Sequence, residues 1–484
     1  MQNKLYVYRN ENLSYPSEEN GFSPSESFPE YRFSTIAESR NPVYPAIRQS
    51  LYALGLDRAH YGTSEWNPFG EVIRSGNTVL IKPNLVRHQN PNGGLDCLVT
   101  HPSVVRAVID YCLIALKGSG HLIVGDAPVQ SCDFESLLQN SGYQRLIEYY
   151  QAQGIDIEWV DFRGTISTHG KNGVLLQRSD KERHDKSKIV DLGKESAFYP
   201  LSSEEQKKLR ITNYSSEEIS KHHFGKRHEY CISDYVLCAD VIMNIPKPKT
   251  HRKAGITACL KNMVGINVEK DYLPHHRKGG KKGGGDEYPK DTAFLRLQTS
   301  LNERIDNANA QQHYNAVRMW HTLQMGLSAW GKIIHQKKNN PYREGSWYGN
   351  DTIWRTISDL NRIVLYADKN GIMQKTPQRK MFCVADMVVA GQGEGPLAPT
   401  PNPMGTLILG EDAIGIDRTV AALFGLDFKA FPSINRVIFG EAFRLENRDS
   451  EIESNDPKLN AKKVGEVDYT GFSRVKLPSG WDSV

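Results

Sequence analysis

The chain has 484 residues, a net charge of +4, 39% apolar residues and 24% charged residues. This composition is typical of a soluble globular enzyme, and the length suits one large domain with insertions or a few smaller domains. The small net charge excludes a general attraction to nucleic acid, and no run reaches the roughly 18 apolar residues that span a bilayer. The first ten residues, MQNKLYVYRN, lack the apolar core of a signal peptide, so we expect a cytoplasmic protein without a membrane partner.

The cysteine pattern argues against a metal-binding or iron–sulfur module in the sequence. The seven cysteines are irregularly spaced, no two form C-x-x-C, and none clusters with histidine at zinc-finger spacing. A ferredoxin-type module needs a tight run of cysteines, which this chain lacks. We therefore expect reduced, mostly buried thiols, while a site assembled from distant cysteines stays an alternative. The positions are 97, 112, 132, 231, 238, 259 and 383.

The first half of the chain predicts alternating strands and helices after a polar N-terminal segment. Residues 1–45 are rich in Ser, Glu and Pro and predict irregular surface structure. Pro102 suits the first position of a helix, with Thr100 or His101 as its N-cap. Residues 163–230 are polar with scattered glycine and predict an insertion of small antiparallel strands. The expected helices are 46–58, 102–116 and 134–151, and the expected strands are 78–82, 121–125 and 155–160.

The second half continues the alternation around a long insertion. Residues 267–292 hold five glycines between Gly279 and Gly285 and predict a flexible loop. Residues 294–335 predict two helices, and the charged tail after residue 440 is expected to be peripheral. Nearly apolar strands such as TVLIK and TLILG favour a mostly parallel, doubly wound α/β sheet flanked by helices, with a core over 46–440. Further strands are expected at 240–245, 362–367, 382–389 and 406–410, and further helices at 352–361 and 413–424.

The segment 240–265, DVIMNIPKPKTHRKAGITACLKNMVG, carries the strongest functional signal. An apolar strand runs into a turn stiffened by two prolines, and ligands of α/β proteins bind where parallel strands end. Close cations lower one another's pKa unless an anion balances them, and a lysine with a lowered pKa is a candidate base or nucleophile. The turn favours an anion site more than a solvated basic surface. The residues concerned are Lys247, Lys249, Thr250 and His251 in the turn, followed by Lys261 and Asn262.

Other polar residues follow the neighbouring strands. Asp126 ends the strand 121–125, where its carboxylate suits a divalent metal ion, the orientation of a lysine or proton transfer. Asp386 lies in the strand 382–389 and is a second candidate ligand for a metal ion. Glu394 is the ionisable residue in GQGEG, where glycines at 391, 393 and 395 allow close backbone approach, and it is a candidate general base or metal ligand. We expect the anion-binding set to include Lys82, Asn84 and Arg106, with His101 as a proton-transfer group.

Two further segments bear possible binding residues, each with a structural alternative. The glycine-rich loop holds His275, His276 and four cations, which favours a lid over a phosphorylated or polyanionic ligand. An unstructured surface loop is its alternative, and the loop has no P-loop pattern. The segment GSWYGNDTIW is an aromatic and polar patch that suits either ring stacking or core packing; its residues are Trp347, Tyr348, Asn350, Asp351 and Trp354.

Taken in order, VLIKPNLV with THPSVVRAVID, IVGDAP, IMNIPKPKTH with ITACLKNMVG, and VVAGQGEGP with LILGEDAIGIDRTVAALFG resemble the family known as domain of unknown function 362. The resemblance extends over about residues 78–440 and implies an α/β fold with a shared site. Some relatives carry an appended iron–sulfur module, and this sequence departs from them because it lacks the cysteine run. The insertions at 163–230 and 267–355 exceed the minimal family pattern and are expected to set the substrate.

These observations favour an enzyme that acts on a phosphorylated or carboxylated small molecule, by group transfer or ligation. No dinucleotide fingerprint, nucleophile elbow or H-E-x-x-H motif is present. Two alternatives stay open: a redox protein with an externally supplied metal, iron–sulfur or flavin centre, and non-catalytic polyanion or RNA binding through the basic loop.

Overall fold

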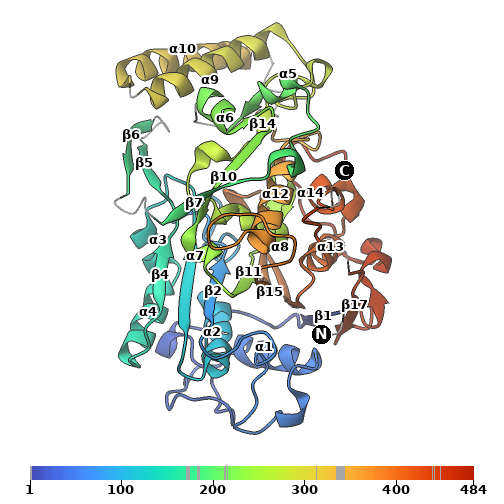
Figure 1. The fold of residues 1–484 in the computed structure, drawn as a ribbon. Coiled ribbons are helices and arrows are strands. Elements are labelled where there is room, and N and C mark those ends of the chain that lie inside the picture. The colour runs from blue at the N-terminus through green and yellow to red at the C-terminus, as the bar shows by residue number, and fades with distance from the viewer. Residues whose placement is uncertain are drawn as a thin grey trace.

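The computed structural model describes residues 3–169, 175–181, 186–211, 214, 216–311, 313–333, 344–438, 440, 442–446 and 448–484. Its centre is one mixed sheet of eleven strands, in which nine strands follow the order β18-β17-β1-β16-β15-β11-β2-β3-β4 (Figure 1). Strands β15, β11, β2, β3 and β4 are mutually parallel, and β1 pairs in parallel with β17. Strand β16 runs antiparallel between β15 and β1. The prediction of a mostly parallel α/β sheet flanked by helices is confirmed.

The strands of this sheet form from short, almost wholly apolar runs. All five residues of β11 are buried, as are the last five of β2, because helices cover both sides of these strands. Two small strands, β12 and β13, leave the carboxyl end of β11 and pair with each other, and β12 also touches β15. The strand bounds are β1 Lys4–Arg9, β2 Thr78–Pro83, β3 His121–Asp126, β4 Glu158–Asp161, β11 Val241–Ile245, β12 Lys249–His251, β13 Gly255–Thr257, β15 Lys380–Glu394, β16 Ala398–Gly410, β17 Glu451–Ser454 and β18 Lys462–Lys463.

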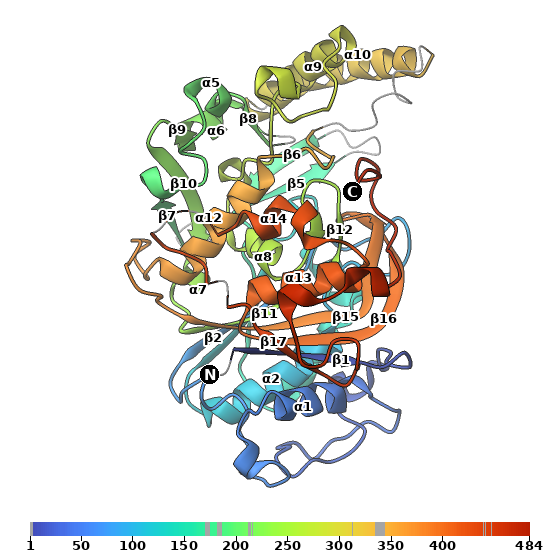
Figure 2. The ribbon, with the colours of Figure 1, turned by 90° about the vertical axis from the view of Figure 1, so that its right-hand side faces the viewer.

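Helices lie on both faces of the sheet, as Figure 2 shows with α1 and α2 below it and α12 and α13 above it. Because side chains alternate along a strand, Val79 and Ile81 pack against the first helix layer, whereas Leu80 packs into the second. The first layer comprises α1 Val43–Ala53, α2 Pro102–Leu116, α3 Phe134–Asn140 and α4 Tyr143–Ala152. The second comprises α7 Asp234–Leu237, α8 Cys259–Asn262, α12 Ile353–Tyr366, α13 Ala413–Leu423 and α14 Pro432–Asn435.

The two insertions form a cap beyond the carboxyl ends of the central strands. The first insertion contains the antiparallel strands that its sequence predicts, and the second contains a hairpin of two helices at the top of Figure 1. The glycine-rich segment is tied to the first insertion by the pairing of β14 with β8. The elements are β5 Thr165–His169, β6 Leu175–Asp180, β7 Ser187–Asp191, α5 Ser203–Gln206, β8 Leu209–Arg210, α6 Ser216–His222, β9 His223–Phe224, β10 Arg227–Ser233, β14 His276–Arg277, α9 Ala293–Ala310 and α10 Tyr314–Ile333.

Several sequence predictions of elements are wrong in detail. The run 362–367 reads as a strand but is the end of α12, because its apolar residues continue the buried face of that helix. The helix expected over 134–151 is two helices, which are separated at Gly142 with a φ of 82°. The Gly/Pro-rich stretch after residue 389 is a long hairpin of β15 and β16, whose pairing extends to Glu394 opposite Ala398.

The two ends of the chain belong to the sheet, contrary to the expectation of an irregular start and a peripheral tail. Strand β1 lies between β16 and β17, and side chains from both ends join one apolar cluster with α13. Leu5 and Ile452 are fully buried there, together with Trp481 from the last four residues. The apolar alternation of KLYVYR is the signal that predicts β1 in an otherwise polar segment.

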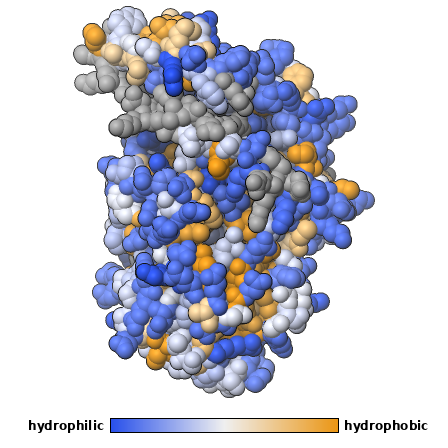
Figure 3. All heavy atoms as spheres, turned by 90° about the vertical axis from the view of Figure 1, so that its left-hand side faces the viewer, coloured by the Kyte–Doolittle hydropathy of each residue, from blue (hydrophilic) through white to orange (hydrophobic). Residues whose placement is uncertain are grey.

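The surface agrees with the polar composition. Figure 3 shows a largely hydrophilic face on the side of β4 and α4, with apolar side chains in a narrow zone in the lower half and others over the helices at the top. Among the helices of the described residues, none is both long and apolar enough to cross a membrane. All seven cysteines are free thiols and only Cys238 is exposed, which confirms the expectation of mostly buried thiols.

Candidate functional site

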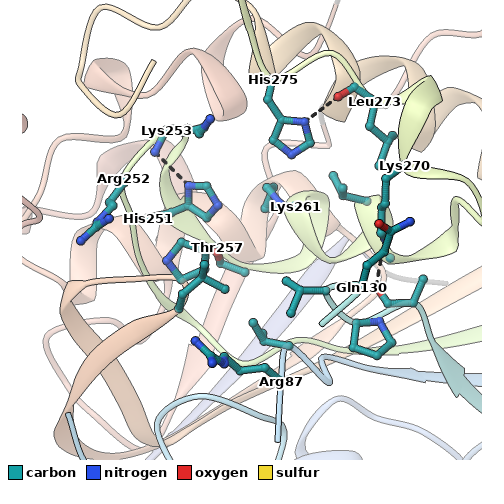
Figure 4. A pocket seen from close by; sticks show the side chains of 18 of the residues that line it. Arg87, Gln130, His251, Arg252, Lys253, Thr257, Lys261, Lys270, Leu273 and His275 are labelled. Carbon is teal, nitrogen blue, oxygen red and sulfur yellow. Dashed lines mark hydrogen bonds between the residues drawn. The ribbon is translucent and has the colours of Figure 1, made fainter. Parts of the chain in front are cut away.

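A cavity of about 490 Å³ opens at the carboxyl ends of β2, β3 and β11. This volume suits a small-molecule ligand. Its walls come from the strand ends, the turn after β11, the segment before β14 and the end of β15, as Figure 4 shows in part. Cationic and imidazole side chains dominate the polar lining: Arg87, Lys249, His251, Arg252, Lys253, Lys261, Lys270 and His275. The acidic residues of the lining are Asp126, Glu344 and Glu394.

An ion pair between Lys82 and Asp126 forms the floor of the cavity. The Lys82 Nζ atom lies 2.6 Å from Asp126 Oδ1, and both side chains are almost fully buried. The second carboxylate oxygen of Asp126 accepts a hydrogen bond from the backbone N–H of Leu85 at 2.6 Å. A Cβ atom on Gly265 would lie 2.0 Å from Asp126 Oδ1, so only glycine allows this close approach. Both carboxylate oxygens of Asp126 therefore already have partners, namely the Lys82 ammonium group and the backbone.

Lys249 enters the cavity from β12 and lacks a carboxylate partner among the described residues. Its ammonium group donates a hydrogen bond to Asn84 Oδ1, and its side chain is fully buried. Burial, together with the nearby charge of Lys247, holds the pKa of Lys249 well below its usual value. The backbone of β15 packs closely against it, since a Cβ on Gly391 would lie 2.6 Å from the Lys249 Cβ. This is the close backbone approach that the GQGEG glycines predict.

Three more lysines face the same space. Burial lowers the pKa of Lys261 to about 8, and the charge of Lys270 acts in the same direction. Burial likewise lowers the pKa of Lys270 to about 8, although its Nζ donates to the Ala127 carbonyl at 3.2 Å. The pKa of Lys253 is also lowered by burial. None of these ammonium groups has an ion pair with a carboxylate in the part of the chain that the structure describes.

The two cavity histidines are held as different tautomers. The Nδ1 atom of His251 accepts hydrogen bonds from the backbone N–H groups of Lys253 and Ala254, both at 3.0 Å, so its hydrogen is on Nε2. The Nδ1 atom of His275 lies 2.6 Å from the Leu273 carbonyl, which only accepts, so Nδ1 carries the hydrogen and Nε2 has a free lone pair. Burial and the surrounding lysines hold the pKa of both rings well below the usual value, so both are neutral at pH 7.

Two further features shape the wall near β13 and the rim. The Thr257 hydroxyl is buried and has no hydrogen-bond partner among the described residues, which is unusual for a buried polar atom. At the rim, Arg252 Nε lies 2.7 Å from Glu394 Oε2, and the other oxygen of Glu394 accepts from the backbone N–H of Ser479 at 2.8 Å. Glu394 therefore holds the rim together through an arginine and the C-terminal tail.

Eight of the residues that the sequence predicts for the site line this one cavity, whereas the others lie elsewhere in the structure. The cavity is lined by Asn84, Asp126, Lys249, His251, Lys261, Asn262, His275 and Glu394, and Lys82 lies directly beneath it. Sequence analysis missed Arg87, Gln130, Arg252, Lys253, Thr257 and Lys270. Arg252 and Lys253 continue the basic turn and are detectable from that pattern, whereas Lys270 lies in a loop with no strand or helix signal.

Lys247, Asp386 and His101 form a second buried cluster outside the cavity lining. Lys247 Nζ lies 2.6 Å from Asp386 Oδ2 and also contacts Tyr15, whose hydroxyl donates to Asp386 at 2.6 Å. His101 caps α2 through Ser103, and its ring stacks on Tyr15 at 3.8 Å between centroids. This cluster anchors the N-terminal segment to the strand ends.

The remaining expected residues have structural contacts. Arg106 is fully buried and pairs with Asp110 at 3.0 Å, and Thr250 donates to the Gly393 carbonyl at 2.8 Å. His276 belongs to β14 and does not line the cavity.

The basic loop and the aromatic patch are likewise tied into the fold. In the basic loop, Arg277 pairs with Asp351 and Lys278 with Glu303. In the patch, the Trp347 Nε1–H group donates to the Asp286 carbonyl at 2.8 Å, and the Trp354 Nε1–H group donates to Asp351. The packing alternative therefore describes these two tryptophans, while Tyr348 is 46% exposed.

The expected metal ligands do not form a ligand set. Among the described residues, no group of three or more His, Cys, Asp or Glu side chains is arranged to hold a metal ion. Asp126 and Asp386 are each neutralised by a lysine at 2.6 Å, which opposes cation binding at either carboxylate.

Comparisons with known proteins agree with the extent of this fold. The family profile described as "Domain of unknown function (DUF362)" matches residues 79–180 and 185–422. The chain is 26% identical over 212 residues to Thylakoid-associated protein sll1697 of Synechocystis, covering 44% of this chain. The alignment covers 46% of that protein, so the chain spans about half the length of this curated relative. No solved structure matches the chain.

Proposed function

The chain belongs to the DUF362 family, and on that premise we propose that its basic cavity binds an anionic small molecule on which the protein acts as an enzyme. The observation that carries this proposal is the convergence of Lys249, Lys253, Lys261 and Lys270 on one cavity without carboxylate partners among the described residues. Burying an ammonium group without a counter-ion opposes folding. A phosphate or carboxylate group in the cavity supplies the missing counter-charge.

The chemistry of the lining favours a transferable or activated anionic group. Lysine ammonium groups in a partly dehydrated site stabilise negative charge that develops on a phosphoryl or carboxyl group during transfer or ligation. His251 supplies an N–H donor and His275 an acceptor, so the same cavity offers groups of both proton-transfer types. Apolar residues such as Leu273 and Leu397 line the space between the cations and suit the uncharged body of the ligand.

Anion binding is tested by titrating inorganic phosphate, pyrophosphate and citrate into the purified protein. We expect saturable heat of binding in calorimetry and a rise in melting temperature, which corresponds to about 2.7 kcal/mol at 100 times Kd. Lys249→Met and Lys261→Met should each weaken binding at least about 10-fold, because each removes a charge from the cavity. Lys282→Met is the control, since Lys282 is exposed and lies outside the cavity lining.

Enzymatic action is tested on the molecule that the protein itself retains. Native mass spectrometry of the purified protein identifies the bound anion, and wild-type protein should convert it with a candidate co-substrate whereas Lys261→Met should not. If none of the three anions binds, or if Lys249→Met and Lys261→Met bind them normally, the proposal is wrong.

The other two hypotheses receive less support. Pairing of Arg277 and Lys278 with carboxylates leaves the basic loop with less charge for an RNA or another polyanion. For the redox alternative, the described residues offer no group of three or more His, Cys, Asp or Glu side chains arranged to hold a metal ion. We place the protein in the cytoplasm as part of the proposal, and because its relative is named for thylakoid association, fractionation of cells into cytosol and membranes tests this placement.

A further inference from the structure

Lys261 differs from the other lysines of the cavity in its surroundings. Its amine has no hydrogen-bond or ion-pair partner among the described residues, whereas Lys82 has Asp126, Lys249 has Asn84 and Lys270 has a carbonyl. It projects from α8, whose neighbouring side chains Leu260 and Asn262 are buried and fix its position. Figure 4 shows Lys261 in the middle of the cavity, with His251 on one side and Lys270 on the other.

The amine of Lys261 is also present partly in its neutral, nucleophilic form near pH 7. Burial and, to a smaller extent, nearby positive charges lower its pKa to about 8, so about a tenth of the molecules carry the neutral amine at pH 7. The groups that act on it are Lys270, Lys82 and Lys253 with Asp126 as the opposing charge. Lys253, the other lysine without a partner, faces the acidic residues Glu344, Asp286 and Glu287, which favour its charged form.

The histidine tautomers complement a nucleophilic amine. In Figure 4 the ring nitrogen of His275 that does not contact Leu273 points towards Lys261. That nitrogen has the free lone pair and can take a proton from the attacking amine. On the other side, the Nε2–H group of His251 is a donor suited to a carbonyl oxygen of the substrate.

We infer that Lys261 is a nucleophile that forms an imine with an aldehyde or ketone carrying a phosphate or carboxylate group. The inference rests on the proposed function, because Lys249, Lys253 and Lys270 hold the anionic group. In the reaction the Lys261 nitrogen bonds to the carbonyl carbon, and the carbon–oxygen bond breaks. The carbonyl oxygen leaves as water with the two hydrogens of the neutral amine. His275 transfers the first of these as a proton, and no oxidant or reductant is consumed.

The test uses glyceraldehyde 3-phosphate as the probe and sodium cyanoborohydride to reduce any imine to a stable secondary amine. Peptide mapping by mass spectrometry of the wild-type protein then gives the labelling rate of every lysine. At pH 7 we expect Lys261 to react about 10-fold faster than the exposed Lys282 or more, because its neutral fraction is larger. Inorganic phosphate should suppress labelling of Lys261 and leave that of Lys282 unchanged.

The pH dependence and a variant sharpen the test. Labelling of Lys261 should rise from pH 6.5 and level off above its pKa of about 8. In Lys261→Met, labelling should not move to Lys253 or Lys270 at a comparable rate. If phosphate stabilises the protein but Lys261 reacts no faster than Lys282, the imine inference is wrong and the anion site stands. If none of phosphate, pyrophosphate and citrate binds, the proposed function itself fails.

Discussion

At the residue scale, lysines around the cavity fall into two groups with opposite effects on folding. Lys82 and Lys247 each have a carboxylate at 2.6 Å and further polar contacts, so their charges are balanced in the fold. Lys253, Lys261 and Lys270 have no such carboxylate among the described residues, and burial lowers their pKa values. The first group supports the strand ends, and the second group leaves a positive cavity that a bound anion stabilises.

This charge imbalance predicts that anion binding weakens as the pH rises. Lys261 and Lys270, with pKa values of about 8, are mostly charged at pH 7 and mostly neutral at pH 9. Sulfate keeps its two charges over this range, so any change in its affinity comes from the protein. Calorimetry with sulfate should show an affinity that falls by about 10-fold per lysine between pH 7 and pH 9. In Lys261→Met the sulfate affinity should fall about 10-fold less over the same pH range, because one titrating lysine is missing. A sulfate affinity of the wild-type protein that does not depend on pH would contradict the prediction.

The same pKa values predict that removing a cavity lysine stabilises the ligand-free protein. Below pH 8 the folded protein holds a half-buried charge that the unfolded chain, with an ordinary lysine pKa of about 10.4, holds in water. Between these two values the unfolded chain binds more protons, so the contribution of Lys261 to stability rises with pH. Lys261→Met should therefore raise the melting temperature at pH 7 by about 2 °C or more in buffer without phosphate or sulfate.

A comparison with the control variant isolates the cause of this stabilisation. The gain of Lys261→Met over wild type should shrink between pH 8 and about pH 9.5, because the wild-type amine becomes neutral. Lys282→Met, in which an exposed lysine is replaced, should leave the melting temperature unchanged at each pH. A lower melting temperature of Lys261→Met at pH 7 would show that the amine stabilises the fold.

At the element scale, sequence patterns predict the strand–turn–helix units better than the segments between them. The runs TVLIK, HLIVG and DVIMNI are apolar enough to identify buried strands, and their ends bring Asn84, Asp126 and Lys249 together as expected. The hairpin of β15 and β16 is hidden because glycine and proline suggest a loop, although its backbone pairs in regular register from Val389 to Glu394. Lys270 escapes prediction because its place is fixed by the Ala127 carbonyl, which is 143 positions away in the chain.

The glycine-rich segment illustrates how tertiary contacts decide the state of a loop. Its flexibility stays a prediction, but Asp286 connects it to the start of α12. One oxygen of this buried carboxylate accepts from the Arg277 N–H group, and the other accepts from the Asp351 N–H group at 2.9 Å and the Thr352 hydroxyl at 2.6 Å. The segment joins β14 and carries His275 just before it, so this carboxylate also steadies one wall of the cavity.

Asp286→Ala should therefore loosen the cavity wall without removing a cavity charge. Loss of hydrogen bonds to a buried carboxylate is expected to cost about 1.5–3 kcal/mol. Hydrogen exchange should become faster over residues 275–290, and phosphate affinity should fall because this wall of the cavity is less well ordered. Lys281→Ala, an exposed change in the same segment, should alter neither measurement. Unchanged exchange in Asp286→Ala would mean that other contacts hold the segment.

At the scale of the whole molecule, the two ends of the chain complete structures that the family match does not include. The match covers residues 79–180 and 185–422, whereas β1, β17 and Trp481 lie outside it. Composition and alternating elements predict the α/β core, but polar, irregular sequence at both ends conceals their part in the sheet. The tail reaches the cavity rim, because Ser479 donates to Glu394 and the Trp481 Nε1–H group donates to the Arg252 carbonyl at 2.6 Å.

Trp481 is the residue through which this tail affects both stability and binding. It is 1% exposed, stacks on Phe431 at 5.5 Å between centroids, and lies in the cluster that contains Leu5 and Ile452. Trp481→Ala should lower the free energy of unfolding by about 3–5 kcal/mol, as for other buried aromatic residues. Trp481→Phe keeps an aromatic ring but removes the hydrogen bond to Arg252, so the loss of that bond should cost about 1 kcal/mol.

Chemical denaturation and phosphate titration of the two variants separate packing from support of the rim. Trp481→Phe should reduce phosphate affinity more than its small loss of stability suggests, because the Arg252 carbonyl loses its donor and the Arg252–Glu394 pair lies on the rim. Asp482→Ala, which replaces the exposed neighbour, should change neither quantity. A Trp481→Ala protein with wild-type stability would mean that the tail is peripheral after all. A Trp481→Phe protein with wild-type affinity would restrict the role of the tail to packing.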